Sequence, residues 1–487
     1  MQKSTPRAYS VRAWWWYPPD FDREVGHAHT VTVAADECAL VNLGSYDCLG
    51  LGCSAATRPG RDEGTLLASE IFVLCFLFSL VGCDGATRRD AGVTDASADA
   101  GPPLECSFPA VLVAGTPETD ALAAAPARCG QTAHRWSRDA SLGTVTAYST
   151  TGLPHYTAAR LQTLAESQGV MLPELTYDPS LVAITYTTQD RGALVEATAL
   201  VAFPRNLPAD APAPDVLLFL HGASGYGDGC GPTHDFGGQL LAALVASFGW
   251  FVVAPDYLGL RGDGTPSTFP HPYLVGQATA IASLDAARAL LRMDPARRGS
   301  RCTSDRVLVL GGSQGGHAAL WIERLAPYYA RELTVVGTVA TVPPADLGGE
   351  VSRALSMLVP ASRSSSTFFG LASPWYGVGD RLNEIFVAPY DTEITAMLGM
   401  GCQPGGPVSP AALEELFVAP LLDAGSTGTL MDYSNFGCMV YENGIPSTSI
   451  ARIASVDPSY ATLVVLGSDD DLVTTPMERG VVESLCA

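Results

Sequence analysis

Charge is scarce in this sequence, and positive charge is scarcest. Asp, Glu, Lys and Arg make up 16% of its residues, with 28 Lys and Arg against 50 Asp and Glu, so the formal net charge is −22 at pH 7. This excess argues against binding to nucleic acid or to an anionic lipid surface, because both require basic patches. Hydrophobic residues make up 47% of the 487 positions, which predicts a globular chain with one large domain and attachments.

Clusters of metal-ligating residues are also absent from the sequence. The eight histidines are scattered, and the acidic run Asp469-Asp470-Asp471 has no further ligands at a regular spacing. We therefore expect no metal site and no cofactor.

The apolar run at residues 71–81 is too short to span a bilayer, but it has the length of a signal-peptide core. It leads into Leu80-Val81-Gly82-Cys83, which resembles a bacterial lipobox, where the cysteine is lipidated and becomes the mature N-terminus. We predict a signal peptide over 66–83 and a flexible tether over 84–105, and hence a protein lipid-anchored to the bacterial cell envelope or secreted. A buried apolar helix or strand is the alternative for the run.

The position of this signal is unusual, because signal peptides begin at the N-terminus. No methionine lies between Met1 and Met171, and residues 1–65 show no clear period. Our hypothesis is that residues 1–65 are a mis-assigned extension and that translation starts at a non-ATG codon near Leu66 or Leu67.

Beyond the tether we predict an N-terminal arm over 106–177 and an α/β domain over 178–487. Apolar strands that alternate with helices indicate a mostly parallel sheet with helices on both faces. The expected strands are residues 181–186, 193–203, 216–220, 250–254, 307–310, 333–342 and 462–466, and the clearest helical spacing is at 274–292. The alternation stops at about 346–458, which we interpret as an inserted, mainly helical cap over the site; a separate small domain is the alternative.

Residues 306–321 (RVLVLGGSQGGHAALW) carry the strongest functional signal. A β-branched run enters Gly-Gly-Ser-Gln-Gly, and a small-residue helix follows, which is the strand–turn–helix context of a nucleophilic serine. We predict Ser313 as the nucleophile. The Gln314 backbone N–H is one expected donor of the oxyanion hole, and the Ala223 N–H, after His221-Gly222, is the other.

A serine nucleophile also needs an acid and a base. Asp470 follows a late strand in the right chain order and is our predicted acid, with Asp469 and Asp471 as neighbouring alternatives. Asp256 precedes the nucleophile, so we expect it to cap the loop at 256–259 instead. The base is missing, because the last histidine of the sequence is His317 and none follows Asp470.

From about Leu181 to Ala487 the chain resembles the secretory lipase family of the α/β-hydrolase fold, in a bacterial lipoprotein version. The resemblance implies that Ser313 is the nucleophile, that Asp470 is the acid and that the cap is a lid. The family places its catalytic histidine shortly beyond a segment like 481–486, and it does not use the positions of His271 and His317 as the base. The shared motifs are residues 221–222, 254–259, 271–274 and 311–317, together with Gly467, Asp470 and Val473.

Three explanations for the missing base stay open. The chain could be truncated before the histidine, it could be a genuine pseudoenzyme, or a displaced histidine such as His317 or His155 could serve. Cysteine parity slightly favours truncation, because seven cysteines remain after Cys83 and seven is odd. Among these seven, Cys302 could pair with Cys230 and Cys402 with Cys438, although sequence does not determine connectivity.

The sequence thus predicts a serine hydrolase, a lipase or carboxylesterase, that acts on carboxylic esters. Lipid-like esters are expected from the aromatic residues of the cap: Phe368, Phe369, Trp375 and Tyr376. The alternative from another class is an inactive lipoprotein that binds hydrophobic ligands or partners; a peptidase or polyester depolymerase is a further alternative.

Overall fold

The computed structural model describes residues 10–14 and 28–32, scattered residues between 106 and 132, and most of 134–486, with a gap at 451–459 and shorter gaps elsewhere. The predicted signal peptide, its Cys83 and the tether lie outside these residues, so their assignment stays a prediction. In the described part of the chain, no helix is long and apolar enough to cross a membrane.

A ten-stranded sheet forms the centre of the molecule, in the order β1-β2-β12-β11-β10-β8-β9-β7-β6-β5. Its five middle strands run parallel, and antiparallel strands extend it on both sides. The parallel strands are β8 (Val216–Leu220), β9 (Phe251–Pro255), β10 (Arg306–Gly312), β11 (Thr334–Thr341) and β12 (Ala461–Gly467). The others are β1 (Ser10–Trp14), β2 (Ala28–Thr32), β5 (Val145–Ser149), β6 (Pro179–Asp190) and β7 (Ala193–Pro204), and β3 (Ala124–Ala125) pairs with β4 (His134–Arg135) in a separate two-stranded sheet.

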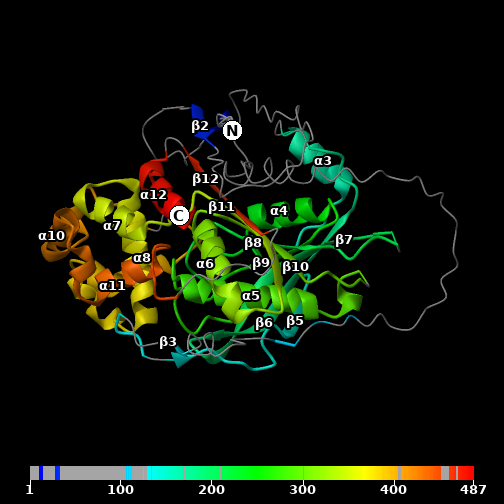
Figure 1. Ribbon diagram of the computed structural model, residues 1–487, viewed down its shortest axis with the longest axis horizontal. Helices are drawn as coiled ribbons and strands as arrows, with labels where there is room; N and C mark the ends of the chain where they lie inside the picture. Colours follow the sequence, from blue (N-terminus) through cyan, green and yellow to red (C-terminus); the bar gives the residue numbers. More distant parts are fainter. Residues whose placement is uncertain are drawn as a thin grey trace, which may run out of the picture.

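Both faces of the sheet are covered, as the continuous apolar strands predicted. Along β8, Val216, Leu218 and Leu220 belong to one buried cluster, while Leu217 and Phe219 belong to another. This follows from the period of two, which points successive side chains to opposite faces. Figure 1 shows α4 on one side of the sheet and α5 and α6 on the other. These three helices are α4 (Phe236–Ala246), α5 (Gly276–Arg292) and α6 (Gln314–Tyr329). A further helix, α3 (Ala158–Ser167), precedes β6.

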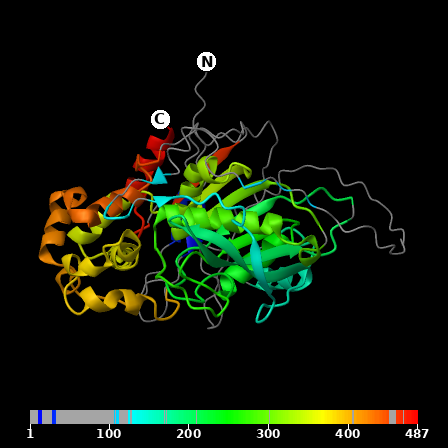
Figure 2. The same ribbon diagram turned by 90° about the horizontal axis from the view of Figure 1, so that it is seen from below.

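A helical cap is inserted between β11 and β12 and lies at one end of the sheet (Figures 1 and 2). After β12 the chain ends in α12 (Thr475–Cys486), which lies beside the cap in both views. The described part of the cap contains α7 (Leu347–Ser356), α8 (Pro360–Tyr376), α9 (Tyr390–Leu398), α10 (Ala419–Thr427) and α11 (Ser434–Asn443), with three short 3₁₀ turns. The predicted fold class, an α/β-hydrolase fold with a mainly helical insertion, is confirmed.

Among the described residues, three disulfides connect parts of the chain that are far apart in sequence. Cys106 is bonded to Cys302, Cys129 to Cys438 and Cys230 to Cys402. The pairings considered from the sequence, Cys302 with Cys230 and Cys402 with Cys438, are therefore wrong. The fold places Cys402 of the cap against the loop after β8, and a sequence without a known fold cannot show that proximity.

Candidate active site

Ser313 occupies a strained turn between β10 and α6. Its backbone has φ of 53° and ψ of −117°, a conformation that non-glycine residues rarely adopt. The neighbouring strand β11 holds the turn from one side, since the Ser313 N–H donates to the carbonyl oxygen of Thr341 at 2.8 Å. Helix α6 holds it from the other, since the His317 N–H donates to the Ser313 carbonyl at 3.0 Å. The side chain is half-buried, so the hydroxyl lies at the boundary of the core.

The glycines around Ser313 are required by close backbone contacts. A Cβ at Gly311 would lie 2.0 Å from the carbonyl oxygen of Gly315, and a Cβ at Gly315 would lie 1.9 Å from that of Leu220. At Gly316 a Cβ would lie 2.8 Å from the Thr341 carbonyl oxygen. Any side chain at these three positions would therefore displace backbone, which explains the composition of the motif.

The loop after β8 lies against the turn. A Cβ at Gly222 would be 3.7 Å from the Cβ of Ser313 and 3.4 Å from the carbonyl oxygen of Gly312. The sequence-predicted donors thus come from two segments that meet at Ser313: Gln314, which is buried at the start of α6, and Ala223, which is half-buried one residue beyond Gly222. An oxyanion hole needs backbone donors from segments that lie beside the nucleophile, and these two segments do so.

Asp470 lies just beyond the carboxyl end of β12. Its Oδ1 accepts the backbone N–H groups of Leu472 at 3.0 Å and Val473 at 2.9 Å, which fixes the turn. Burial raises the pKa of Asp470, and the neighbouring carboxylates of Asp471 and Glu350 act in the same direction. Of the alternatives, Asp469 lies outside the described residues and Asp471 is exposed.

Three histidines near the turn are buried, and each is engaged by neighbours. Desolvation lowers the pKa of His221, His271 and His317 to about 4, so all three are neutral at pH 7. The Nε2 of His317 is 2.7 Å from the carbonyl oxygen of Asn443 in α11, so its proton is directed to the cap. His271 Nδ1 is 2.7 Å from the Leu258 carbonyl oxygen, and its Nε2 accepts from Gln314. The interpretation of His271 and His317 as hydrogen-bonding residues is confirmed. His155, the other candidate for a displaced base, is exposed on the N-terminal arm.

Asp256 does not cap its own loop, and that expectation is wrong. Its carboxylate accepts from the Thr198 hydroxyl at 2.6 Å, and from the Thr233 N–H at 2.9 Å and hydroxyl at 2.6 Å. It therefore links β7, β9 and the loop before α4. Burial raises the pKa of Asp256 to about 6.

The sequence analysis missed Glu478 of α12. Its Oε2 accepts the N–H groups of Ala345 at 2.7 Å and Asp346 at 3.1 Å, where the chain enters the cap, and its Oε1 has no hydrogen-bond partner in the described structure. Burial raises its pKa to about 8, and the nearby Glu350 and Asp346 add to the shift. In the sequence, a single glutamate in an amphipathic helix gives no sign that its side chain will be buried. Among the described residues, no group of His, Cys, Asp and Glu is arranged to hold a metal ion.

Comparisons with known proteins agree with this geometry. Residues 238–376, which include Ser313 and Gln314, match the model of the secretory lipase family. Over 112 residues the chain is 35% identical to Lipase 7 of Candida albicans; the match covers 22% of this chain and 24% of that protein. The resemblance to secretory lipases predicted from the motifs is thereby confirmed.

Solved structures show the same fold over a longer stretch. The esterase LipA of Xanthomonas oryzae, described as rice cell wall degrading, has a TM-score of 0.59 at 20% identity, covering 71% of this chain and 88% of its own. Candida antarctica lipase A in its closed state has a TM-score of 0.50 at 16% identity, covering 71% and 74%. At these identities the likeness establishes the α/β-hydrolase fold.

Proposed function

We propose that this chain, which shares the fold of these lipases and esterases, is a serine hydrolase of carboxylic esters. In the proposed reaction the Ser313 hydroxyl oxygen attacks the ester carbonyl carbon while a base takes its proton. The carbonyl π electrons move to the oxygen, which the Gln314 and Ala223 amides stabilise. Collapse expels the alcohol, and water then hydrolyses the acyl-enzyme.

One observation carries the proposal: Ser313 is held at φ of 53° between a buried strand and a helix, with the Gly222 loop against it. Strain of this kind persists only where the surrounding structure imposes it, and it clusters at functional sites. A serine with a purely structural role would not require three glycines in backbone contact around it.

Asp470 is the proposed acid, and the proposed base is a histidine. No histidine follows Asp470 in the sequence. Asp470 would hold the imidazole of that histidine in the orientation needed to accept the serine proton.

The proposed substrates are lipid-like esters, but the four aromatic residues of the cap do not support this. Phe368, Phe369, Trp375 and Tyr376 are all buried, so they form the core of the cap and cannot line a binding surface. The apolar side chains that the cap exposes are different ones: Met357, Leu358, Met400 and Met431, each at least 45% exposed. These side chains support an apolar substrate or surface near the cap.

The second candidate is an inactive protein that binds hydrophobic ligands in the same site. The observation in its favour is that His221, His271 and His317 are all buried and neutral, and that two of them have their ring nitrogens directed to backbone or to Gln314. The printed bonds thus engage His271 and His317 with partners other than Ser313.

Hydrolysis of p-nitrophenyl butyrate by the full chain and by its Ser313→Ala variant tests the proposal, with and without added imidazole. If the base is missing but the rest of the site is intact, free imidazole should raise the rate of the wild type above that of Ser313→Ala. Equal rates for the wild type and Ser313→Ala, both with and without imidazole, would contradict the proposal and favour the binding protein. Parallel assays with a long-chain ester and a peptide anilide would separate a lipase from an esterase or a peptidase.

A further inference from the structure

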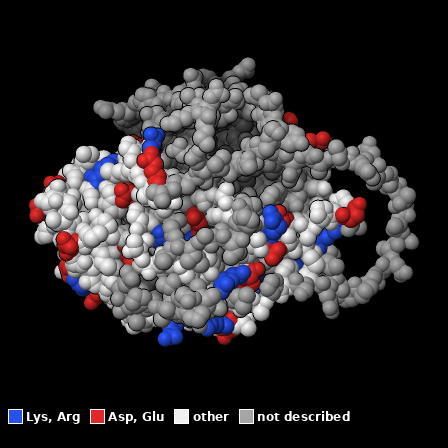
Figure 3. All heavy atoms as spheres, viewed as in Figure 1, with Lys and Arg blue, Asp and Glu red and all other residues white. Residues whose placement is uncertain are grey.

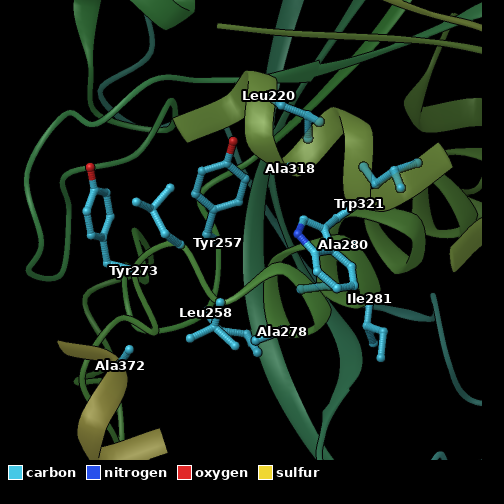
Figure 4. Close-up of a cluster of buried hydrophobic side chains, with 14 of the residues drawn as sticks. Leu220, Tyr257, Leu258, Tyr273, Ala278, Ala280, Ile281, Ala318, Trp321 and Ala372 are labelled. Carbon is cyan, nitrogen blue, oxygen red and sulfur yellow. The ribbon is translucent and has the colours of Figure 1, made fainter. Parts of the chain in front are cut away.

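Tyr257 lies two residues beyond the end of β9 in a conformation that tyrosine rarely adopts, with φ of 69°. Its side chain is fully buried. Figure 4 shows its ring within the core, with Leu258 close by and Tyr273 and Trp321 on opposite sides. No step of the proposed reaction uses this residue, so its strained backbone and burial call for another explanation.

Two histidine rings lie parallel to the Tyr257 ring. The centroid of His221 is 4.2 Å away with an interplanar angle of 17°, and that of His271 is 6.0 Å away at 12°. All three rings are neutral at pH 7, because burial lowers the histidine pKa values to about 4 and raises that of Tyr257 well above its ordinary value. The stack therefore brings no charge into the core.

The first side of the stack holds the loop that carries Ala223. The Tyr257 hydroxyl donates to the carbonyl oxygen of His221 at 2.9 Å, and the Nδ1 of His221 is 2.7 Å from the carbonyl oxygen of Gly222. Two successive carbonyls before Ala223 are thus fixed by buried side chains. Fixing these carbonyls fixes the peptide plane that precedes the Ala223 N–H.

The second side of the stack holds Gln314. The His271 Nδ1 donates to the Leu258 carbonyl at 2.7 Å, which leaves Nε2 as the acceptor, and the Gln314 side-chain Nε2 donates to it at 2.7 Å. This tautomer is assigned from the two partners. The N–H of Gln314 is the other proposed donor, and its side chain is thereby anchored to His271. His271 in turn is bonded to Leu258, the residue after Tyr257.

We infer that Tyr257 and His271 are positioning residues that set the spacing between the two halves of the oxyanion hole. The inference rests on the proposed function, because it assumes that Gln314 and Ala223 are the donors. The inference goes beyond that function because it assigns the relative placement of the two donors to the stack of His221, Tyr257 and His271, which takes no part in the reaction. Neither residue contacts substrate, so each acts only through the donors.

The probe is phenylboronic acid, whose boron accepts a lone pair of the serine oxygen. A B–O bond forms, the hydroxyl proton leaves to solvent, and the resulting tetrahedral anion presents its oxygens to the donors. Binding to the full chain would be measured by titration with ¹¹B NMR, which distinguishes tetrahedral from trigonal boron and needs no turnover.

The decisive variant is Tyr257→Phe, which keeps the stack and removes the bond to His221. Its matched control is Tyr186→Phe, since Tyr186 is equally buried and its hydroxyl donates to the Ala282 carbonyl at 2.9 Å away from the site. We expect similar losses of melting temperature in both. Only Tyr257→Phe should weaken the boronate complex, by about tenfold or more, a part of the 100- to 1,000-fold that loss of a whole donor costs.

The outcomes separate the two proposals. If the wild type binds boronate only through Ser313 but Tyr257→Phe binds as tightly as Tyr186→Phe, the positioning inference fails and the proposed function stands. If the wild type and Ser313→Ala bind equally, both fail. Should Tyr257→Phe not fold, His271→Ala decides in its place, because it removes the anchor of Gln314 and should give the same weakening.

Discussion

At the scale of single residues, the space around the Ser313 turn is the feature most open to a direct test. A Cβ at Gly315 would lie 1.9 Å from the Leu220 carbonyl oxygen, whereas a Cβ at Gly480, on the exposed side of α12, would meet nothing within 4 Å. We expect Gly315→Ala to lower the free energy of unfolding by roughly 1–3 kcal/mol or more, because backbone must move. Gly480→Ala should raise it by about 0.5–1 kcal/mol, since alanine is the better helix former.

Urea denaturation of the two variants checks this prediction. A Gly315→Ala protein as stable as the wild type would mean that the turn and β8 are not packed as described. The Gly480→Ala variant controls for the general effect of replacing glycine in a helix.

The pH dependence of stability should report Glu478. Burial raises its pKa from 4.5 to about 8, so the folded chain keeps a proton that the unfolded chain releases above pH 4.5. The folded state therefore binds more protons over this range, and stability contributed by the group falls as pH rises from about 4.5 to 8. We expect Glu478→Gln, which keeps an acceptor for the Ala345 and Asp346 amides, to remove most of that fall.

The measurement is the unfolding free energy of both proteins between pH 5 and 8. Glu483→Gln, an exposed position on the same helix, is the matched control and should follow the wild type. Parallel curves for the wild type and Glu478→Gln would contradict the assigned burial.

At the scale of elements, two disulfides and several hydrogen bonds attach the cap to the core. Cys230–Cys402 links the loop after β8 to the cap, and Cys129–Cys438 links the N-terminal arm to α11. The Trp375 indole of α8 donates to Asp190 at 2.7 Å at the β6–β7 turn. Attachments on several sides predict a cap that moves little as a unit.

Removing one disulfide should loosen the cap selectively. We expect the Cys230→Ala, Cys402→Ala double variant to lose about 2–4 kcal/mol of stability and to exchange amide hydrogens faster in α9 and α10. The control is the Cys106→Ala, Cys302→Ala double variant. The disulfide that it removes closes a chain segment of similar length, 196 against 172 residues, and does not involve the cap. The control variant should lose comparable stability without the faster cap exchange; equal exchange in both would show that the cap is held by other contacts.

The sequence predicted most elements of the sheet because strongly apolar strands leave little choice of structure. The runs at 216–220 and 462–466 became β8 and β12, and the segments at 181–186 and 193–203 became one antiparallel hairpin, β6 and β7. The turn at Ser313 was also predictable, because the local spacing of glycines determines it. Contacts between segments that are distant in sequence were not predictable. The disulfide partners and the Asp256 contacts depend on which loops meet in the fold, and no local sequence pattern encodes this.

At the scale of the whole molecule, charge is spread thinly. Figure 3 shows acidic and basic side chains scattered over one face, with uncharged surface between them. Lysine is nearly absent, since Lys3 is the only one in the sequence, and it lies within the predicted mis-assigned extension.

The predicted maturation can therefore be tested by labelling amines. If the mature chain begins at a lipidated Cys83, it has no lysine, and an amine-reactive ester can modify at most its N-terminal amine. A chain that begins at Met1 would be labelled at Lys3 as well. Intact mass of the protein purified from a bacterial host, beside a Cys83→Ala control that cannot be lipidated, distinguishes the two; any recovered peptide from residues 1–60 would contradict the start near Leu66.

The disulfide connectivity also has a consequence for biosynthesis. The three bonds span 196, 309 and 172 residues. At a synthesis rate of about 5–20 residues per second, Cys129 is made roughly 15–60 s before Cys438. Cys106 is already made by then, and Cys230, Cys302 and Cys402 are made during that interval. Bonding each of these six cysteines to its nearest neighbour along the chain would give only non-native pairs. Efficient production of this protein therefore requires a disulfide isomerase in an oxidising compartment, and a reducing cytosol would yield the chain without its links between cap and core.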